Sequence, residues 1–522
     1  MTPTPESTPE SAPTSAPTPA SLWRLTGPDL RGTEPLPTLA QTLIAGAGLA
    51  GLAAALELAR AGHQVVVVDA DELGGRTTSR TTGKVSLLQG STVAGVRERA
   101  GEDAAAAYLD ANRAGAGWMR RELASVPGAW EDRTSYTYAT TAEGVAALET
   151  EADAMAAAGS PVETVPARPA GGIGLPVAVD GALRMSDQAQ IQPVIAAAAL
   201  IARIREAGGV VVERCRVTGV SATGGGVTVM TDRGEIAVER LILATGTPIL
   251  DRSLLFATLV PQRQTVVAFR LRHDAHGSAP RGMYLSVDPV GRSIRTARDS
   301  DGSPAIVVGG GGIVTGRADG IGDLRDAILA WTAEHFPGAT PITWWAAQDY
   351  RMTTHLPYAG AIRGGHDRVF AMTGFAKWGM TNAPAAALAV VGEITGDVPS
   401  WHRTLRDRRT GVRGLGIRDL GETAAANAEV GAHLVAGWVA PRSHSESGRA
   451  EIVRSGIRPV AESRVDGAVC RVSAVCPHLG GIVRWNDAES TWDCPLHGSR
   501  FTADGRVIEG PATQDLAQAD AD

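Results

Sequence analysis

Four residues near the end of the chain have the types and spacing of metal ligands. Two cysteine–histidine pairs, Cys476 with His478 and Cys494 with His497, are separated by fifteen residues. Two thiolates on one iron and two imidazoles on a second iron can hold a [2Fe–2S] cluster. The same four side chains could instead bind a structural zinc ion, because two cysteines with two histidines also form a common zinc site.

The residues around the two pairs favour the iron–sulfur cluster. The first pair lies in C-P-H-L-G-G (476–481) and the second in C-P-L-H-G-S-R-F (494–501). Proline and glycine supply tight turns that point ligands inward, and this context is more specific than an isolated Cys-x-His motif. We therefore predict a [2Fe–2S] cluster. Since such a cluster carries one electron at a time, the rest of the chain must supply or take those electrons.

A glycine-rich turn near residue 46 predicts a dinucleotide site. Gly46, Gly48 and Gly51 form G-x-G-x-x-G directly after the apolar segment T-L-I-A, and a helical pattern follows. The first glycine permits a tight turn, the second lets the backbone approach a pyrophosphate, and the third lets the helix pack closely on the strand. Asp69 ends the next apolar strand, V-V-V-V, where an acid can bind a ribose hydroxyl.

Two later segments indicate which dinucleotide is bound. The stretch E-L-G-G-R-T-T-S-R-T-T-G-K (72–84) follows the acid, and L-I-L-A-T-G-T-P (241–248) comes much later. In this order they resemble the G-G-x-[ST] and A-T-G elements of glutathione-reductase-type flavoproteins. The resemblance implies that the cofactor is FAD. Its neighbours would include the following residues of the two segments: Gly75, Arg76, Thr77 and Gly246.

A third segment, V-F-A-M-T-G-F-A-K-W-G-M-T-N (369–382), reads as a strand and a glycine loop before an alanine-rich helix. The amino terminus of a helix is suited to stabilise the negative charge of a reduced flavin. The segment resembles the closing FAD segment of D-amino-acid-oxidase-like enzymes. This resemblance implies Gly374, Lys377, Gly379 and Met380 as flavin neighbours. Lys377 is assigned by placement alone, and an ordinary surface or core role is the alternative.

Composition limits the possible partners and the location. With 522 residues and 44% apolar content, the chain can form two or three domains. A formal net charge of −7 and the lack of any lysine–arginine run argue against a nucleic-acid partner. No apolar run predicts a membrane span, and the first residues lack the pattern of a signal peptide. Four cysteines, two of them cluster ligands, fit a reducing compartment, so we expect a cytoplasmic protein.

The pattern changes along the chain predict four regions. Residues 1–40 are rich in proline, threonine, serine and alanine, which predicts a disordered tail. Residues 41–410 predict an α/β Rossmann-like FAD-binding unit of the glutathione-reductase type, with an inserted mixed α+β substrate domain. Residues 411–447 predict a helix and a polar linker. Residues 448–522 contain short strands with turns between them, which predicts a small all-β domain.

Two resemblances cover most of the chain. Residues 448–516 resemble a Rieske [2Fe–2S] domain, and residues 41–400 resemble D-amino-acid-oxidase-like FAD oxidoreductases. A fusion of these two parts resembles a bacterial family of FAD-dependent oxidoreductases with a C-terminal Rieske domain. The resemblance implies an enzyme in which a flavin and an iron–sulfur cluster exchange electrons.

One departure from the Rieske pattern affects the predicted reduction potential. High-potential Rieske proteins carry two further cysteines that clip the ligand loops together, and here Gly481 and Leu496 stand at those positions. Ser499 is kept and can donate to a cluster sulfide, but Phe501 replaces a tyrosine that is often found there. Fewer hydrogen bonds to sulfur lower the potential. We therefore predict a value in the lower or middle Rieske range, and loops held mainly by the cluster.

The two cofactors predict a dehydrogenase. An amine or amino-acid substrate would give a hydride to FAD, and an external ferredoxin, cytochrome or quinone would finally accept the electrons. The carboxylate of an amino acid would need an arginine, and the candidates are Arg263, Arg270, Arg295 and Arg351. No motif indicates the catalytic residues. The alternatives are an NAD(P)H-linked electron-transfer module for a partner oxygenase, which the lack of a second Rossmann motif disfavours, and a redox sensor.

Overall fold

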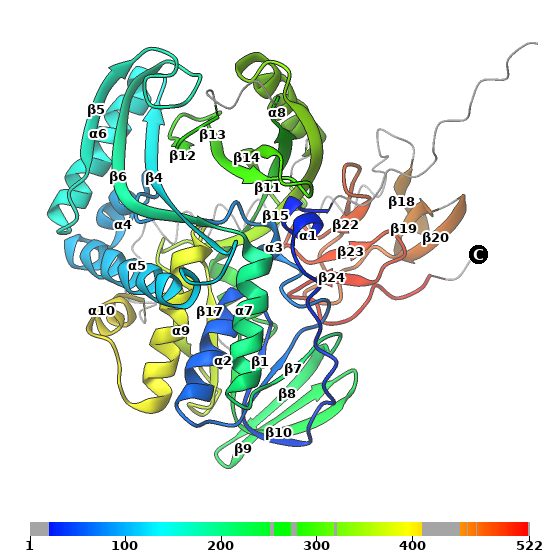
Figure 1. Ribbon diagram of the computed structural model, residues 1–522. Coiled ribbons are helices and arrows are strands. Elements are labelled where there is room, and N and C mark those ends of the chain that lie inside the picture. The colour runs from blue at the N-terminus through cyan, green and yellow to red at the C-terminus, as the bar shows by residue number, and fades with distance from the viewer. Residues whose placement is uncertain are drawn as a thin grey trace, which may run out of the picture.

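The computed structural model describes residues 20–250, 255–272, 279–317, 321–409, 449–456, 458–465 and 467–519, and the predicted helix and linker at 411–447 lie outside these ranges. Figure 1 shows a larger N-terminal unit (residues 20–409) with a smaller C-terminal domain (residues 449–519) packed on its side. The helices are α1 (Leu22–Thr26), α2 (Leu49–Arg60), α3 (Thr77–Arg80), α4 (Thr92–Ala100), α5 (Glu102–Leu123), α6 (Ala142–Ala157), α7 (Pro193–Glu206), α8 (Ile321–His335), α9 (Gly379–Thr395) and α10 (Ser400–Arg409), with a 3-10 helix η2 (Leu255–Thr258).

The first sheet of the N-terminal unit contains the predicted dinucleotide fold. Its strands run in the order β16–β17–β10–β1–β2–β7, and β8 and β9 extend from β10 as an antiparallel meander. Strands β17, β10, β1, β2 and β7 are parallel. The strands are β1 (Leu39–Ala45), β2 (Val65–Val68), β7 (Val210–Val212), β8 (Val217–Thr223), β9 (Gly226–Thr231), β10 (Gly234–Leu243), β16 (Tyr358–Ala361) and β17 (Val369–Thr373). All four valines of β2 are buried, because a parallel sheet is covered on both faces.

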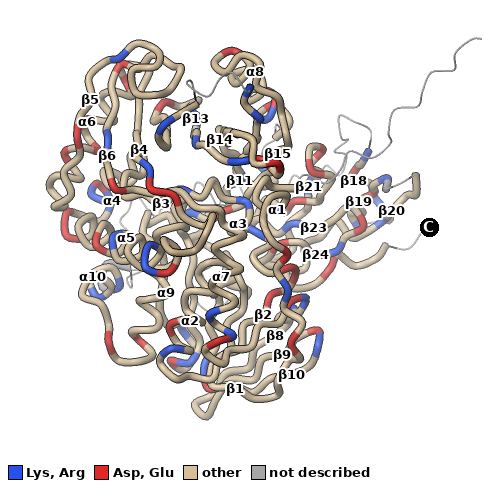
Figure 2. Tube along the Cα trace, in the orientation of Figure 1, with Lys and Arg blue, Asp and Glu red and all other residues tan. Residues whose placement is uncertain are grey.

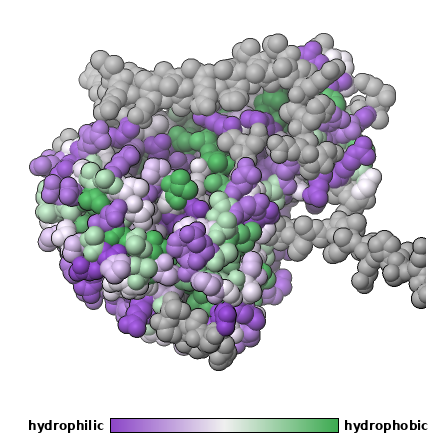
Figure 3. All heavy atoms as spheres, turned by 90° about the horizontal axis from the view of Figure 1, so that it is seen from above, coloured by the Kyte–Doolittle hydropathy of each residue, from purple (hydrophilic) through white to green (hydrophobic). Residues whose placement is uncertain are grey.

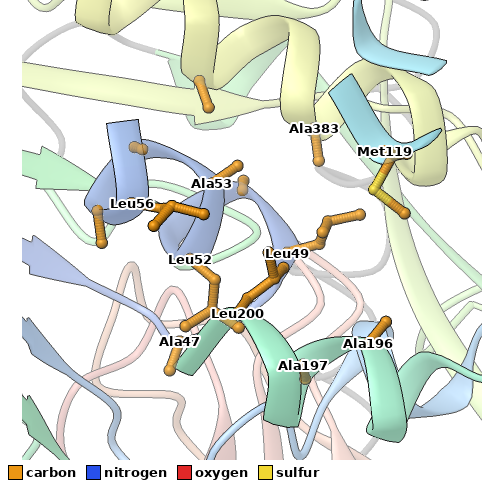
Figure 4. Packing of buried hydrophobic residues seen from close by; sticks show 14 of the residues in the cluster. Ala47, Leu49, Leu52, Ala53, Leu56, Met119, Ala196, Ala197, Leu200 and Ala383 are labelled. Atoms are coloured by element: carbon orange, nitrogen blue, oxygen red, sulfur yellow. The ribbon is translucent and has the colours of Figure 1, made fainter. Parts of the chain in front are cut away.

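Helices α2, α7 and α9 pack together over one face of this sheet. Figure 4 shows Leu49 and Leu52 of α2 directed toward Leu200 of α7, with Ala383 of α9 nearby. Leu52 and Leu200 are completely buried, and each such leucine contributes about 1.5–3 kcal/mol by leaving water. This packing fixes the start of α2, and therefore the glycine turn that precedes it.

A second sheet forms the rest of the N-terminal unit. Its strands run in the order β15–β11–β14–β13–β12–β4–β6–β3, and β5 pairs with β6. Neighbours are antiparallel except β4 and β12, which are parallel. The strands are β3 (Lys84–Val85), β4 (Trp130–Ala139), β5 (Glu163–Arg168), β6 (Val179–Ile191), β11 (Leu259–Arg270), β12 (Met283–Ser286), β13 (Arg292–Arg298), β14 (Pro304–Val314) and β15 (Thr340–Met352). This mixed sheet with α6 and α8 is the mixed α+β part of the fold, and its role as a substrate domain stays a prediction.

The described part of the C-terminal domain consists of strands and turns. One sheet has three antiparallel strands and the other has four. The strands are β18 (Ala450–Ser455), β19 (Arg458–Val465), β20 (Ala468–Ser473), β21 (Arg484–Asn486), β22 (Thr491–Asp493), β23 (Arg500–Thr502) and β24 (Val507–Glu509). Its core includes Trp492 and Phe501, together with Cys476 and Cys494. The predicted fold class, an α/β FAD-binding unit joined to a small all-β domain, is confirmed.

The prediction that the tail is disordered as far as residue 40 is wrong for residues 20–40. Ser21 caps α1, and Leu22 and Trp23 are buried beneath the N-terminal unit. Trp23 donates to the carbonyl oxygen of Thr81 at 2.7 Å and lies edge-on against Trp345. Two large apolar side chains therefore offset the ordering cost of a segment whose composition is otherwise that of a tail. Residues 1–19 lie outside the described ranges.

The described helices include none that is long and apolar enough to cross a membrane. Figure 2 shows lysine and arginine residues interspersed with aspartate and glutamate along the tube. In the face seen in Figure 3, apolar residues occur in small groups among polar ones.

Candidate functional site

A cavity runs along the carboxyl ends of the parallel strands, where open α/β sheets bind their ligands. Its wall includes Gly46 after β1, Asp69 after β2 and Gly246 after β10. Ten of the twelve residues predicted for the FAD site line this cavity: Gly46, Gly48, Asp69, Gly75, Arg76, Thr77, Gly246, Lys377, Gly379 and Met380. The fold thus brings together segments that are more than three hundred residues apart in the sequence.

The other two predicted residues, Gly51 and Gly374, lie behind the wall and shape the backbone. A Cβ atom on Gly51 would collide with the carbonyl oxygen of Gly46, so only glycine lets α2 cross β1 this closely. Gly374 has φ of +80°, which favours glycine. Gly48 faces the cavity, and a Cβ atom there would meet only the Thr78 hydroxyl, at 3.3 Å. Its backbone therefore remains accessible to a ligand.

Asp69 is held at the end of β2 by two backbone donors. Its Oδ2 atom accepts from the N–H of Ala47 at 2.8 Å, and its Oδ1 atom accepts from the N–H of Asp71 at 3.1 Å. Burial raises the pKa of Asp69 to about 6, although both hydrogen bonds favour the charged form. At neutral pH the carboxylate is therefore charged and fixed in the cavity wall, as a ribose-binding acid must be.

The hydroxyl-rich loop after β2 is tied to both sides of the cavity. The Thr77 hydroxyl donates to the main-chain carbonyl of Gln348 in β15 at 2.7 Å. The Thr78 hydroxyl accepts from the N–H of Leu49, at the start of α2, at 2.9 Å. These bonds hold the loop between the glycine turn and the second sheet.

Asp349 and Lys377 form a polar pair in the cavity wall. Ala376 and Lys377 have φ of 50° and 76°, a left-handed conformation that costs non-glycine residues about 1 kcal/mol or more each. Asp349 holds this turn by accepting from the N–H of Lys377, and it also accepts from the N–H of Tyr350 at 2.7 Å. Burial raises the pKa of Asp349 to about 6 and lowers the pKa of Lys377. No motif in the sequence indicates Asp349.

None of the four arginines predicted to anchor a substrate carboxylate lines this cavity. Each has a partner elsewhere: Arg263 pairs with Glu489, Arg270 with Asp299 and Asp301, Arg295 donates to the carbonyls of Thr82 and Ile191, and Arg351 contacts His355. Most of these partners are distant in the sequence, so the sequence alone could not identify them.

A different arginine, Arg80 at the end of α3, does line the cavity. Among the described residues no acid lies within ion-pair distance of it, and its hydrogen bond to the carbonyl of Ala346 is long, at 3.4 Å. Burial, followed by the nearby guanidinium of Arg263, lowers the pKa of Arg80 to about 10. The side chain is therefore a cation at neutral pH and is suited to bind an anion in the cavity.

The four predicted metal ligands meet in the C-terminal domain as two like pairs. Cys476 and Cys494 are each 2% exposed, and a hydrogen bond between their thiols lowers the pKa of Cys476. The rings of His478 and His497 have centroids 5.0 Å apart and planes at 84°. A thiolate pair beside an imidazole pair is the donor set of a [2Fe–2S] cluster in which two cysteines hold one iron and two histidines hold the other.

The surroundings of the sulfurs also fit this cluster. In each ligand loop, the backbone N–H groups two and three residues after the cysteine bond to its sulfur. These bonds favour a thiolate, although the neighbouring Cys476 and burial raise the pKa of Cys494. In the part of the chain that the structure describes, no three histidine, cysteine, aspartate or glutamate side chains converge on one metal-ion position.

The first ligand loop (residues 476–481) and the second ligand loop (residues 494–499) have the same backbone hydrogen bonds. Cys476 N donates to the carbonyl of Gly481, and Gly480 N donates to the carbonyl of Cys476. The equivalent bonds of the second loop join Cys494 N to Ser499 O and Gly498 N to Cys494 O. The two glycines have φ of 76° and 77°. The repeated pattern explains how two short segments present equivalent ligands.

The N-terminal unit covers the histidine pair. Phe256, in η2, lies edge-on against His478 with ring centroids 5.7 Å apart, and edge-on against His497 with centroids 5.0 Å apart. Both imidazoles are only partly exposed. The predicted cluster therefore lies at the junction of the two parts of the chain.

The C-terminal domain in turn forms part of the dinucleotide cavity. Five of its residues line the wall: Ile508, Glu509, Gly510, Ala512 and Thr513. The N–H of Ala512 donates to the hydroxyl of Ser499 at 3.0 Å, and this hydroxyl is hydrogen-bonded to Cys476. One wall residue and one serine thus connect the cavity with a cluster ligand.

These features define a flavoprotein oxidoreductase joined to a Rieske iron–sulfur domain. The family model "FAD dependent oxidoreductase" matches residues 41–392, and the chain belongs to this family. The model "Rieske [2Fe-2S] domain" matches residues 439–520. The protein is an enzyme of this class, its cofactors are FAD and a [2Fe–2S] cluster, and the predicted family resemblance is confirmed.

Particular relatives share either the whole architecture or one part of it. YhfW of Bacillus subtilis, whose name describes a Rieske 2Fe-2S iron–sulfur protein, is 28% identical over 97% of this chain and 98% of its own length. The chloroplastic cytochrome b6-f iron–sulfur subunit of Arabidopsis thaliana is 49% identical over 63 residues, which cover only 28% of that protein. L-Proline dehydrogenase from P. horikoshii has a TM-score of 0.58 at 17% identity, covering 72% of this chain and 99% of its own. Glycine oxidase from Geobacillus kaustophilus has a TM-score of 0.54 at 18% identity, covering 70% and 96%.

Proposed function

We propose that this enzyme oxidises a small amine or amino acid at its FAD site and passes the electrons through its own Rieske cluster to an external one-electron acceptor. The observation that carries the proposal is the shared wall. Ala512 lines the dinucleotide cavity and bonds to Ser499, which bonds to the cluster ligand Cys476. Electron transfer between the two sites therefore needs no movement of one domain relative to the other.

When bound, FAD supplies a two-electron hydride acceptor and the cluster supplies a one-electron carrier. The predicted FAD residues would hold the dinucleotide along the cavity, with the glycine turn at the start of α2 binding its phosphates. The substrate loses a hydride from the carbon beside its nitrogen and a proton from the nitrogen, so a carbon–nitrogen single bond becomes an imine.

We assign the polar groups of the cavity wall to three tasks. Arg80 binds the carboxylate of an amino-acid substrate, because it is a cavity-lining arginine without an ion pair among the described residues. Asp349 accepts the proton, since its pKa of about 6 leaves it ionised near neutral pH. Lys377 and the start of α9 stabilise negative charge in the cavity.

The fold of the relatives supports this substrate class. Proline dehydrogenase and glycine oxidase, which act on amino acids by their names, share the fold of the N-terminal unit. An oxidase returns electrons to oxygen, and an attached cluster indicates instead a protein or quinone acceptor. None of the four cysteines forms a disulfide bond, which supports a reducing, cytoplasmic location.

Anaerobic stopped-flow spectroscopy tests the proposal on the protein loaded with both cofactors. Mixing with a panel of amines and amino acids should bleach the flavin absorbance, and loss of the oxidised cluster bands should follow. The Arg80→Gln variant should raise KM for amino acids about a hundredfold with little change for uncharged amines, because a charge-assisted pair is lost. Rapid bleaching by NADH or NADPH, with no response to any amine, would contradict the proposal and favour the electron-transfer module.

A further inference from the structure

The second ligand loop is in close contact with the N-terminal unit. A Cβ atom on Gly498 would lie 2.5 Å from Cβ of Pro261 in β11, and a Cβ atom on Gly316 would lie 2.8 Å from the nitrogen of Pro495. The Arg317 Nε atom donates to the carbonyl of Pro495 at 2.9 Å. Two backbones therefore approach each other where glycine leaves room, and side chains of the N-terminal unit bond to the loop.

Gln348, in β15, is the centre of these contacts. Its Nε2 atom donates to the carbonyl of Gly498 at 2.8 Å and contacts the hydroxyl of Tyr350 at 2.8 Å. Its Oε1 atom accepts from the hydroxyl of Thr315 at 2.7 Å. The side chain is 2% exposed. Both ends of the buried amide are satisfied, so its orientation is fixed with the donor facing the loop.

The same glutamine also faces the dinucleotide site. Its main-chain carbonyl accepts from the hydroxyl of Thr77, a predicted FAD neighbour, and Asp349 beside it lines the cavity. The neighbouring Tyr350 hydroxyl donates to the carbonyl of Gly510, which is part of the shared wall. One short stretch of β15 therefore contacts the cavity on one side and the second ligand loop on the other.

A buried ion-pair cluster fixes the same interface. Arg263 of β11 binds Glu489 of the C-terminal domain through its Nε and Nη2 atoms, and the two side chains are 1% and 7% exposed. Arg500 lies between Glu489 at 3.2 Å and Asp493 at 3.0 Å. Such a group is specific in geometry, because removing one partner leaves a buried charge without its main counter-ion.

No covalent link joins the two ligand loops. All four cysteines are free, and residues 481 and 496 approach each other as a glycine and a leucine, with a Cβ on Gly481 2.7 Å from Cγ of Leu496. Neither loop is therefore clipped to the other. The second loop is fastened instead to β11, β15 and the residues that follow β14.

We propose that the N-terminal unit holds the second ligand loop in place, and that Gln348 is the residue that positions this loop. Gln348 acts through the carbonyl of Gly498, next to the ligand His497, and so sets the geometry of the histidine-ligated iron. The cluster is thereby fixed relative to the dinucleotide cavity without a disulfide. The inference rests on the Rieske cluster and not on the proposed substrate.

The full-length, cluster-loaded protein tests this with Gln348→Met, which removes the amide at nearly constant volume and keeps the main-chain carbonyl for Thr77. The dithionite-reduced variant should show shifted EPR g-values and a shifted cluster midpoint potential. Release of iron to a chelator should be about tenfold faster, because a buried loop carbonyl has lost its donor. FAD content should stay at the wild-type level.

The matched control is Gln188→Met, at a buried glutamine of β6 whose amide bonds to the backbone of Leu87 and Ser186, away from the cluster. It should lower thermal stability without changing the EPR spectrum or iron release. If Gln348→Met does not fold, Thr315→Val frees the same amide to rotate and should give smaller changes of the same kind. Wild-type g-values, potential and iron release in a folded Gln348 or Thr315 variant would overturn the proposal.

Discussion

The two ligand loops have matching backbone hydrogen bonds and very different surroundings. In the first loop Pro477 is exposed and Leu479 is 46% exposed. In the second loop Pro495 is buried against Gly316 and Arg317 of the N-terminal unit, and Leu496 is 5% exposed in the core of the C-terminal domain. Local sequence therefore sets the shape of a ligand loop, whereas the surrounding fold decides which loop fastens the cluster to the rest of the enzyme.

The largest effect is expected from removing either thiolate ligand of the cluster. The two loops should respond alike, because both cysteines are assigned to the same iron. Cys476→Ser and Cys494→Ser should each reduce cluster iron to nearly zero, with Cys476→Ser keeping its FAD. Iron and acid-labile sulfide assays, together with the flavin absorbance, measure this. Cys470→Ser, at a half-buried thiol in β20, is the control and should keep both cofactors. A Cys476→Ser protein with full iron would disprove the ligand assignment.

Breaking the ion pair beside the second loop should have the next largest effect. Arg263→Met removes the two-nitrogen partner of Glu489 and leaves this buried carboxylate with Arg500 alone, so it should cost about 3–5 kcal/mol of unfolding free energy. The double variant with Glu489→Met should recover part of this loss, since the buried carboxylate is gone. Chemical denaturation measures all three proteins. Arg270→Met, at a more exposed pair with Asp299, should cost much less, because solvent screens that pair. Equal losses of unfolding free energy for Arg263→Met and Arg270→Met would contradict the proposal that the N-terminal unit holds the second ligand loop in place.

Acid should loosen the same interface selectively. Burial raises the pKa of Glu489, but Arg263 and Arg500 outweigh burial and lower the pKa to about 2, below its ordinary value of 4.5. The resulting stabilisation is complete above pH 4.5 and is lost as the pH falls from about 4.5 toward 2; it amounts to about 3 kcal/mol. Melting temperatures between pH 3 and 6 should fall less steeply for Glu489→Gln than for the wild type. Parallel slopes would refute this account.

The two positive-φ glycines offer the sharpest comparison of the loops. A Cβ atom on Gly480 would meet nothing within 4 Å, so Gly480→Ala should cost only the backbone strain, about 1 kcal/mol. A Cβ atom on Gly498 would collide with Pro261, so Gly498→Ala should cost about 2–3 kcal/mol more. Thermal denaturation followed at the cluster bands measures both. Equal losses in the two variants would mean that the second loop is not confined.

The smallest effect is expected at the exposed side chain of the first ligand loop. Leu479→Ser should change stability by less than about 0.5 kcal/mol, because the side chain is already half in water. Leu496→Ser, at the buried leucine of the second ligand loop, should cost about 2–4 kcal/mol. Differential scanning calorimetry measures both variants. Similar melting points would show that the two leucines are equally exposed, which would contradict the distinction between the first and second ligand loops.

The features that could be predicted from the sequence are those whose residues lie close together along the chain. The glycine turn at Gly46, the acid at Asp69 and the two ligand loops were all predicted, because each chemistry needs particular residues at fixed spacing. The structure places these residues around one cavity and one cluster site. The identity of the ligating and FAD-contacting residues is still a prediction, which the cysteine variants address for the cluster.

What the sequence could not predict depends on partners far along the chain. Arg263 was a candidate substrate anchor only because it is an arginine, but its partner Glu489 is 226 residues away in another domain. Order in α1 depends on contacts of Trp23 with residues 81 and 345. Gln348 and Asp349 belong to no motif, since their roles come from what β15 lies against.

The shared wall also has a consequence for assembly in the cell. Domains fold as units and in order during synthesis, the N-terminal part first. The wall residues Ile508, Glu509, Gly510, Ala512 and Thr513 follow the whole N-terminal unit in the sequence and are therefore synthesised after it. The dinucleotide cavity is thus open on that side while the polypeptide is still being made, and it closes when the C-terminal domain docks. An unfinished polypeptide therefore offers FAD a wider entrance to the cavity than the folded full-length chain does.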